Sequence, residues 1–326
     1  MQNILGIDVS KDTLDVVLVT EKGCFHKVIS NSFQGYQSLG NWLKAKRAEQ
    51  VHTCLEATGQ YGEGVATYMF DQGYEVSVVN PARIKRYGES KLHRNKTDKA
   101  DAELIAEFCQ KEKPSLWQPL SLEIKHLRAL VRRLADQKTN LQQEINRLKS
   151  GEKDAWVKQD LQTHIEYLRE RIKATKKEIK NLIDQTSNLK FQHKLLTTIP
   201  GIGDLTANTL LAEIGDFSAF ENAPQLAAYA GLNPRGHRSG SSVLKKTQVS
   251  KQGRAELRRC LYMPAIVALS CNPVIQSLAE RMTKTNHQKM EIVIAAMRKL
   301  LHLSYGVLKT QLPFDPDYGA QFNYPS

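Results

Sequence analysis

The chain has 326 residues, with 46 Lys and Arg against 34 Asp and Glu, which is a formal net charge of +12. This length suffices for two domains and a spacer, and the positive charge favours a polyanionic partner. The sequence has no run of 18 apolar residues and no basic n-region at its start, which excludes a membrane-spanning helix and a signal peptide. We therefore expect a cytoplasmic protein without a membrane partner. Its five scattered cysteines show no CxxC pair and no zinc-ligand spacing.

Residues 1–115 are predicted to form an α/β domain. Short apolar and β-branched runs predict five strands, and apolar positions with helical spacing predict helices between them. The predicted strands are residues 4–9, 14–19, 25–29, 51–55 and 75–79, and the predicted helices are residues 36–48 and 62–72. Three early strands followed by alternating helices and strands predict a mixed sheet with an antiparallel meander.

Four acidic residues in this domain are candidates for a metal site. Asp8 and Glu56 each end a predicted strand, where α/β sheets usually bind ligands. Asp98 and Asp101 are three residues apart, so both carboxylates lie on one helix face. Such a set can hold one or two Mg²⁺ ions, which prefer oxygen ligands and can stabilise both reacting oxygens of a phosphoryl transfer. Each acid alone would equally fit a helix cap or an ion pair.

The segment just before Asp98 is dense in positive charge. Its basic residues are Arg83, Lys85, Arg86, Lys91, Arg94, Lys96 and Lys99. A solvated loop would also have this composition, but the position beside the acidic pair favours contact with phosphates.

Residues 116–190 are predicted to form a coiled-coil or helical spacer. Apolar positions step by four and three in two heptad seams, which residues 150–154 separate. The first seam contains Leu127, Val131, Leu134, Lys138, Leu141, Ile145 and Leu148, and the second contains Leu161, Ile165, Leu168, Ile172, Thr175, Ile179 and Leu182. A helical hairpin within one chain and a coiled coil between chains both fit. The length of the seams and their charged flanks favour association with a partner chain.

Residues 191–326 are predicted to form a mostly helical domain. The turn Pro200-Gly201-Ile202-Gly203 precedes an Ala/Leu-rich helix over residues 205–214. This arrangement is typical of a helix-hairpin-helix, in which Gly201 and Gly203 would let backbone N–H groups meet a DNA phosphate. A tight turn that merely packs two helices is the alternative.

A polar, Gly-rich loop is predicted over residues 230–242, and a basic run follows over residues 245–254. The candidate phosphate contacts here are Arg235, Arg238, Lys245, Lys246, Lys251 and Arg254. A serine hydroxyl among such cations can act as a nucleophile on phosphorus, because the cations stabilise its alkoxide. From the chemistry alone, a phosphate-binding loop whose serines only donate hydrogen bonds is the simpler interpretation.

Several motifs taken together resemble the DEDD insertion-sequence transposases, relatives of the pilin-gene invertase that include RNA-guided recombinases. The N-terminal motifs are GIDVSK at residues 6–11, EATG at 56–59 and KTDKADA at 96–102. The C-terminal motifs are IPGIG at 199–203, GLNPR at 231–235, SG at 239–240 and VSKQG at 249–253. The resemblance covers nearly the whole chain, with the motifs in the family's order.

The resemblance implies a RuvC-like RNase H fold for the first domain, with Asp8, Glu56, Asp98 and Asp101 as the Mg²⁺-binding tetrad. It implies a serine nucleophile in the helical second domain, here Ser239 with Ser241 as the alternate, because three serines follow one another closely. It further implies a coiled coil that mediates assembly into dimers or tetramers, with the tetrad of one subunit completed by the serine of another. The implied partners are double-stranded DNA and an element-encoded guide RNA.

The expected function is therefore DNA transposition or site-specific recombination with strand cleavage and rejoining. A structure-selective endonuclease of the Holliday-junction-resolving kind would use the same tetrad with water as the nucleophile. A non-catalytic nucleic-acid-binding scaffold would keep the basic surface while the acids serve as caps or ion-pair partners.

Overall fold

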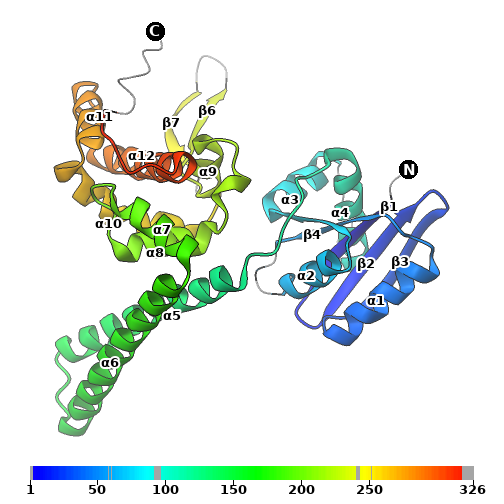
Figure 1. Cartoon of the computed structure of the whole chain (residues 1–326), viewed down its shortest axis with the longest axis horizontal. Helices are drawn as coiled ribbons and strands as arrows, with labels where there is room; N and C mark the ends of the chain where they lie inside the picture. The colour runs from blue at the N-terminus through cyan, green and yellow to red at the C-terminus, as the bar shows by residue number, and fades with distance from the viewer. Residues whose placement is uncertain are drawn as a thin grey trace. The chain divides into compact units, whose positions relative to one another are not determined.

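The computed structural model describes residues 3–57, 59, 61–91, 97–239, 243–250 and 252–317, with the backbone alone described for 235–239 and 243–248. The chain divides into two compact units, Met1–Pro119 and Leu120–Ser326. Each unit has its own sheet or helical core (Figure 1).

The first unit contains a five-stranded mixed sheet. Its strands are β1 (Asn3–Val9), β2 (Thr13–Thr20), β3 (Gly23–Ser30), β4 (Val51–Glu56) and β5 (Glu75–Val79). The order across the sheet is β3-β2-β1-β4-β5. Strands β1 to β3 form an antiparallel meander, and β4 lies parallel to both β1 and β5. The predicted strands and the mixed sheet are confirmed.

Helices cover both faces of this sheet, because β1 and β4 carry apolar side chains on both sides. Helices α1 (Phe33–Ala45) and α2 (Glu63–Asp71) pack on the face that contains Leu5 and Ile7. Helices α3 (Pro81–Ser90) and α4 (Asp98–Glu112) pack on the face that contains Ile4 and Cys54. Successive side chains of a strand point to opposite faces, so Gly6 and Asp8 lie on the same face as Ile4.

The second unit begins with a helical hairpin of α5 (Leu122–Lys149) and α6 (Ala155–Gln185). The two predicted seams face each other within this chain. Their buried members are Leu127, Val131 and Leu134 on α5, and Ile165, Leu168, Ile172, Thr175 and Ile179 on α6. The intrachain hairpin, one of the two predicted alternatives, therefore buries these positions.

Further helices follow in the described part of this unit (Figure 1). They are α7 (Ser187–Thr197), α8 (Asp204–Ile214), the 3₁₀ helix η1 (Phe217–Ala219), α9 (Ala223–Tyr229), α10 (Ala255–Cys271), α11 (Pro273–Lys284) and α12 (Lys289–Thr310). Helix α8 is buried from Thr206 to Ile214, which explains its Ala/Leu-rich sequence. In the described part of the chain, no single helix is long and apolar enough to cross a membrane. Helices α10 and α11 together are long and apolar enough for a membrane span by length and composition alone, but the pair is bent by 89°.

The predicted loop over residues 230–242 is wrong in part, because the structure forms a two-stranded antiparallel sheet there. Its strands are β6 (Pro234–Ser239) and β7 (Val243–Val249), with an irregular register between Arg235 and His237. The density of Gly and Ser over residues 236–242 masked the β-forming residues Val243, Thr247 and Val249 of the second strand. Cross-strand pairing thus overrides local composition at this position.

Candidate functional site

Close contact between β1 and α4 brings the predicted acids into one region. Gly6 lies directly under α4, where a Cβ atom would overlap the carbonyl oxygen of Ala102 and come within 2.6 Å of Ala106 N. A glycine is required at this position because any side chain would push the helix away from the strand. The helix therefore rests on the sheet face that Asp8 shares.

Glu56 lies on the same face as Asp8. Gly6 pairs with Cys54 in the parallel β1–β4 ladder, and each acid follows its member of that pair by two residues. The period of two along a strand therefore places both carboxylates on the α4 side of the sheet, at neighbouring strand ends. This placement agrees with the prediction from the two strand-end acids.

Asp98 and Asp101 occupy the first turn of α4. The Thr97 hydroxyl caps this helix by accepting a hydrogen bond from Ala100 N at 3.2 Å. The N-terminal end of a helix carries partial positive charge and unpaired N–H groups, which stabilise carboxylates placed there. The helix therefore holds two acids beside the strand ends at a reduced electrostatic cost.

The electrostatics of Asp8 show that the other three acids act on it. Burial, followed by the negative charges of Asp101, Asp98 and Glu56 and then of Asp15, raises the pKa of Asp8 to about 6. Like charges and desolvation both disfavour the ionised carboxyl. The three other predicted tetrad members are thus close enough to perturb Asp8.

A cation is the natural ligand of such a cluster, because it would relieve the repulsion that raises this pKa. Carboxylate oxygens are the ligands that Mg²⁺ prefers. Within the described residues, however, no group of three or more His, Cys, Asp or Glu side chains is arranged to hold a metal ion as it stands. The two findings are compatible, since Coulomb repulsion extends several ångströms beyond a metal–oxygen bond of about 2.1 Å. Holding an ion would require the carboxylates to close in around it.

Asn31 ties together the segments that follow the two acid-bearing strands. Its Nδ2 donates to the backbone oxygens of Ser10 at 2.9 Å and Tyr61 at 3.1 Å. Its Oδ1 accepts from the Tyr36 hydroxyl at 2.5 Å. The segment after Asp8 and the segment after Glu56 are therefore held by one amide, which sequence reasoning missed because Asn31 resembles an ordinary turn residue.

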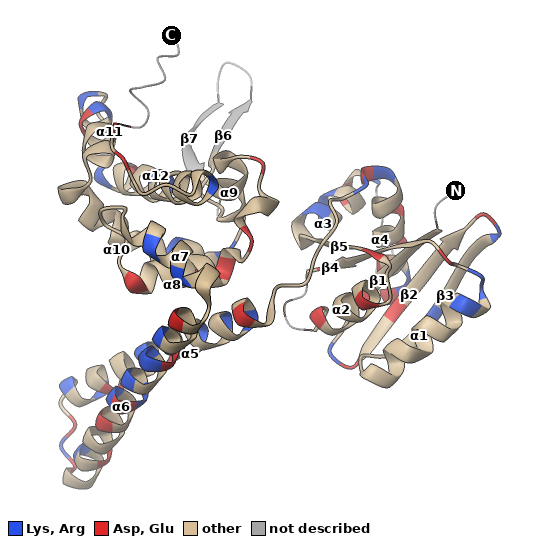
Figure 2. Ribbon diagram, in the orientation of Figure 1, with Lys and Arg blue, Asp and Glu red and all other residues tan. Residues whose placement is uncertain are grey.

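The predicted basic segment is partly helical rather than a loop. Residues 81–90 form α3, which starts with Pro81 at its first turn and is capped by the Asn80 side chain on Ala82 N. Arg83, Lys85 and Arg86 are exposed on this helix, and its positive charge is visible as the blue ribbon of α3 in Figure 2. The Arg83 guanidinium also lies over the ring of Phe108 at 5.4 Å. Arg94 and Lys96 lie outside the described residues.

The predicted serine segment is a hairpin with a fixed base. Ser250 N donates to Asn233 O at 2.9 Å, and Arg254 N donates to Tyr229 O at 3.0 Å. Ser239 is the last residue of β6, and its side chain is not described. The same holds for the side chains of Arg235, Arg238, Lys245 and Lys246, while Ser241 and Lys251 lie outside the described residues.

Arg254, a predicted phosphate contact, has partners within the second unit. Its Nε donates to the Tyr229 hydroxyl at 2.9 Å, and its Nη1 lies 3.6 Å from the carboxylate of Glu213. Glu213 is the residue that sequence reasoning missed here. Its side chain is buried, and Arg132 from α5 pairs with it through both oxygens. This network joins α5, α8, α9 and the start of α10 beneath the hairpin.

The turn between α7 and α8 contains both predicted glycines. Gly201 has a φ of +99°, and a Cβ there would lie 2.7 Å from the Ala268 Cβ atom of α10. Gly201 therefore serves backbone geometry and close packing. Gly203 is the N-cap of α8 and provides no side-chain cap. A Cβ atom added at Gly203 would meet no other atom within 4 Å, so this end of the turn is open.

Comparisons with known proteins agree across both units. A model described as "Transposase IS116/IS110/IS902 family" matches residues 193–280, and a DEDD transposase model matches residues 5–151. The chain is 38% identical over 314 residues to the pilin gene-inverting protein of Moraxella lacunata, covering 95% of this chain and 97% of that protein. It is 29% identical over 296 residues to the transposase for insertion sequence element IS1111A of Coxiella burnetii, covering 79% and 75% of the two chains. Among solved structures, T. thermophilus RuvC in complex with a Holliday junction substrate is 16% identical, with a TM-score of 0.28 over 36% of this chain and all of that one.

Proposed function

The chain belongs to the IS116/IS110/IS902 family of transposases, and on that basis we propose that it cleaves and rejoins DNA with a metal-dependent acidic site and a serine nucleophile. It is a DNA transposase or recombinase. The proposal concerns the finer chemistry: the Mg²⁺ ligands, the attacking group and the nucleic acids bound.

The observation that supports the acidic site best is the raised pKa of Asp8. Burial and the charges of Asp101, Asp98 and Glu56 all contribute to it. Asp8, Glu56, Asp98 and Asp101 would hold one or two Mg²⁺ ions, which would supply stabilisation of the charge that develops on the reacting phosphate. Families of this kind generally use divalent metal ions.

The attacking group is the hydroxyl of Ser239, with Ser241 as the alternate. Its oxygen forms a bond to phosphorus while the bond from phosphorus to the leaving sugar oxygen breaks, and the serine proton passes to a base or to water. The resulting phosphoserine ester retains the energy of the phosphodiester. Attack by the sugar hydroxyl of another strand then rejoins DNA and regenerates the serine without ATP.

Nucleic-acid contacts complete the proposal. Lys85 and Arg86 on α3, with Arg94 and Lys96 beyond it, would neutralise phosphates near the acidic site. Arg235, Arg238, Lys245 and Lys246 would do so at the serine hairpin. We also propose that the open N-terminus of α8 after Gly203 meets a DNA phosphate, that an element-encoded RNA guides target choice, and that the active protein is a homo-oligomer.

A water-dependent nuclease is the second candidate, because all four acids lie within the first unit and need no residue of the second. The deciding experiment is an in-cell excision assay with native flanking DNA, in which PCR detects the circular junction. Wild type should form the junction, and Asp98→Ala and Ser239→Ala should not. A denaturing gel should show a protein–DNA adduct that Ser239→Ala lacks. Cleavage of branched DNA without any adduct would instead establish the nuclease.

A further inference from the structure

The second unit contains a pocket that none of the predicted site residues lines. It has a volume of about 610 Å³ and is formed where α6, α7 and α8 meet the first half of α5. The buried apolar residues Leu134, Ile179 and Ile183 line it together with several charged side chains. This volume falls in the range of about 300 to 1,000 Å³ that small-molecule sites occupy.

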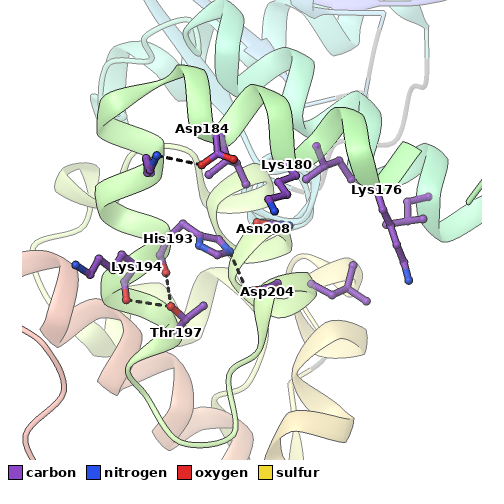
Figure 3. A pocket seen from close by; sticks show the side chains of 13 residues that line it. Lys176, Lys180, Asp184, His193, Lys194, Thr197, Asp204 and Asn208 are labelled. Carbon is purple, nitrogen blue, oxygen red and sulfur yellow. Dashed lines mark hydrogen bonds and ion pairs between the residues drawn. The ribbon is translucent and has the colours of Figure 1, made fainter. Parts of the chain in front are cut away.

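Positive charge predominates around the pocket. Lys176, Lys180, Lys190 and Lys194 line it against Asp184 and Asp204, a net charge of +2 without His193. Lys190 pairs with Asp184 at 3.2 Å, and His193 Nε2 lies 3.5 Å from Asp204 (Figure 3). Among the described side chains, no ion pair with an acid is found for Lys176, Lys180 or Lys194. Burial and the charge of Lys176 also lower the pKa of the adjacent Lys138, as expected where cations are crowded.

Asn208 is an unsatisfied polar group at this pocket. Only 9% of the residue is exposed, and its Oδ1 has no hydrogen-bond partner. A buried amide oxygen without a partner costs about 1–3 kcal/mol, so its retention requires an explanation. Asn208 lines the pocket beside Lys180, so a bound ligand can supply the missing donor once the amide turns its oxygen toward the pocket (Figure 3).

The N-terminus of α8 lies at the same place. Gly203 caps this helix of 11 residues without a side chain, and Asp204 and Leu205 of its first turn line the pocket. Unpaired N–H groups at a helix start attract anions. The exposed Leu205 adds an apolar surface on which a flat ring can rest.

We propose that this pocket binds one nucleotide unit of a nucleic-acid strand. Lys176, Lys180 and Lys194 would contact its phosphates, and Asn208 Oδ1 would accept a hydrogen bond from a base amino group or a sugar hydroxyl. The combination of ammonium groups, an apolar lining and an unpaired acceptor fits a nucleotide better than a bare phosphate. The inference rests on the proposed function, since it adds a contact for the nucleic acid on which the enzyme acts.

The test measures binding of the full chain to labelled single-stranded RNA, single-stranded DNA and duplex DNA in EDTA, where no strand is cut. The variant K176Q/K180Q removes two phosphate contacts, and K173Q/K177Q removes two exposed lysines of the same helix outside the pocket. Each lost contact to a single strand should weaken binding about fivefold at about 0.1 M salt. We therefore expect a loss of about 25-fold and a shallower salt dependence for K176Q/K180Q relative to K173Q/K177Q.

Asn208→Leu separates binding from folding. Leucine has a similar shape and removes the unpaired oxygen, so the melting temperature should not fall, whereas nucleic-acid affinity should. Acetylation of lysines, read by mass spectrometry, should show Lys176 and Lys180 protected by the bound strand and Lys173 and Lys177 still reactive. A loss confined to RNA would identify a ribonucleotide, and an equal loss for RNA and DNA would identify the shared phosphodiester.

Two results would overturn the inference. The first is equal affinity of K176Q/K180Q and K173Q/K177Q for all three nucleic acids, with no selective protection. The second is an Asn208→Leu protein that binds like wild type. Continued excision in cells with either result would leave the proposed function standing. If wild type fails to excise the element while the pocket variants still bind nucleic acid more weakly, the proposed function is contradicted and the proposed nucleotide site stands.

Discussion

Arg132 and Glu213 form a bidentate ion pair that joins α5 to α8. Arg132 Nε and Nη2 donate to Glu213 Oε1 and Oε2 at 2.8 and 2.9 Å. The Glu213 side chain is only 1% exposed. Burial alone would raise the pKa of Glu213, but the hydrogen bonds and charge of Arg132, with the charges of Arg128 and Arg254, hold that pKa below its usual value. The pair therefore anchors the spacer hairpin to the domain that carries the serine strands.

Replacing Arg132 by Met should destabilise the second unit strongly. The change leaves the Glu213 carboxylate buried without its main partner, a defect that typically costs about 3 kcal/mol or more. Urea unfolding followed by circular dichroism measures the effect. Arg133→Met is the matched control, because Arg133 is exposed on the next position of the same helix and should change stability by less than about 0.5 kcal/mol. Equal effects of the two changes would show that the pair contributes nothing particular.

Asp8→Asn should stabilise the metal-free protein at pH 7. The folded-state pKa of Asp8 is about 6, above the usual 3.8. The folded state therefore holds this proton more tightly than the unfolded state, and stability falls as pH rises from about 4 through 6. Neutral Asn removes that loss, so the variant should melt higher than wild type at pH 7 and equally at pH 4. Asp12→Asn, a change of an exposed acid in the same β1–β2 turn, is the matched control and should melt like wild type at pH 7.

Divalent-ion binding should weaken as pH falls below 6. The cation competes with the proton on Asp8, so each unit below this pKa should reduce affinity about tenfold per proton displaced. Calorimetric titration with Mg²⁺ in two buffers of different ionisation enthalpy should detect proton release near pH 6. Asp8→Asn should abolish that release. Proton uptake, or an affinity independent of pH, would contradict the acidic site.

Gly6→Ala should separate α4 from β1 and reduce activity. The added methyl group would overlap Ala102 O, which is backbone and has nowhere to move except with the helix. We expect a loss of about 2 kcal/mol or more by overpacking and loss of excision in cells. Gly306→Ala is the control within α12, since a Cβ there meets no atom within 4 Å. Alanine at that helical position should stabilise the protein by up to about 1 kcal/mol.

Asn31→Ala should lower metal affinity more than it lowers stability. It removes both hydrogen bonds that hold the Ser10 and Tyr61 segments after the strands of Asp8 and Glu56. Tyr36→Phe removes only the bond to Asn31 Oδ1 and leaves both donated bonds intact. Mg²⁺ titration should therefore give a higher Kd for Asn31→Ala and a near wild-type Kd for Tyr36→Phe. Unchanged Mg²⁺ affinity in both variants would show that Asn31 does not position the acidic site.

Periodicity predicted most elements within a few residues. In β1, β4 and the α5–α6 hairpin, the buried positions coincide with the apolar positions of the local sequence pattern. The strand from Val51 and the seam through Leu127 and Val131 could be identified from their apolar spacing alone. The sequence did not predict the β6–β7 hairpin, because β6 consists mainly of Pro, Gly, His and Arg, which are not typical strand residues. Its only described pairing is with β7. Residues with long-range partners, such as Glu213 and Asn31, have no local pattern that would single them out.

By itself, the sequence determined which acids are available, where the strands that carry two of them end, and that Asp98 and Asp101 share a helix face. Those properties depend on residues close together in the chain. Tertiary structure decided that α4 rests on Gly6, that Arg254 turns toward Glu213 and Tyr229, and that Asn208 is buried with an unpaired oxygen. These depend on which distant surfaces pack together, and packing is set by the summed contacts of the whole unit rather than by any short segment.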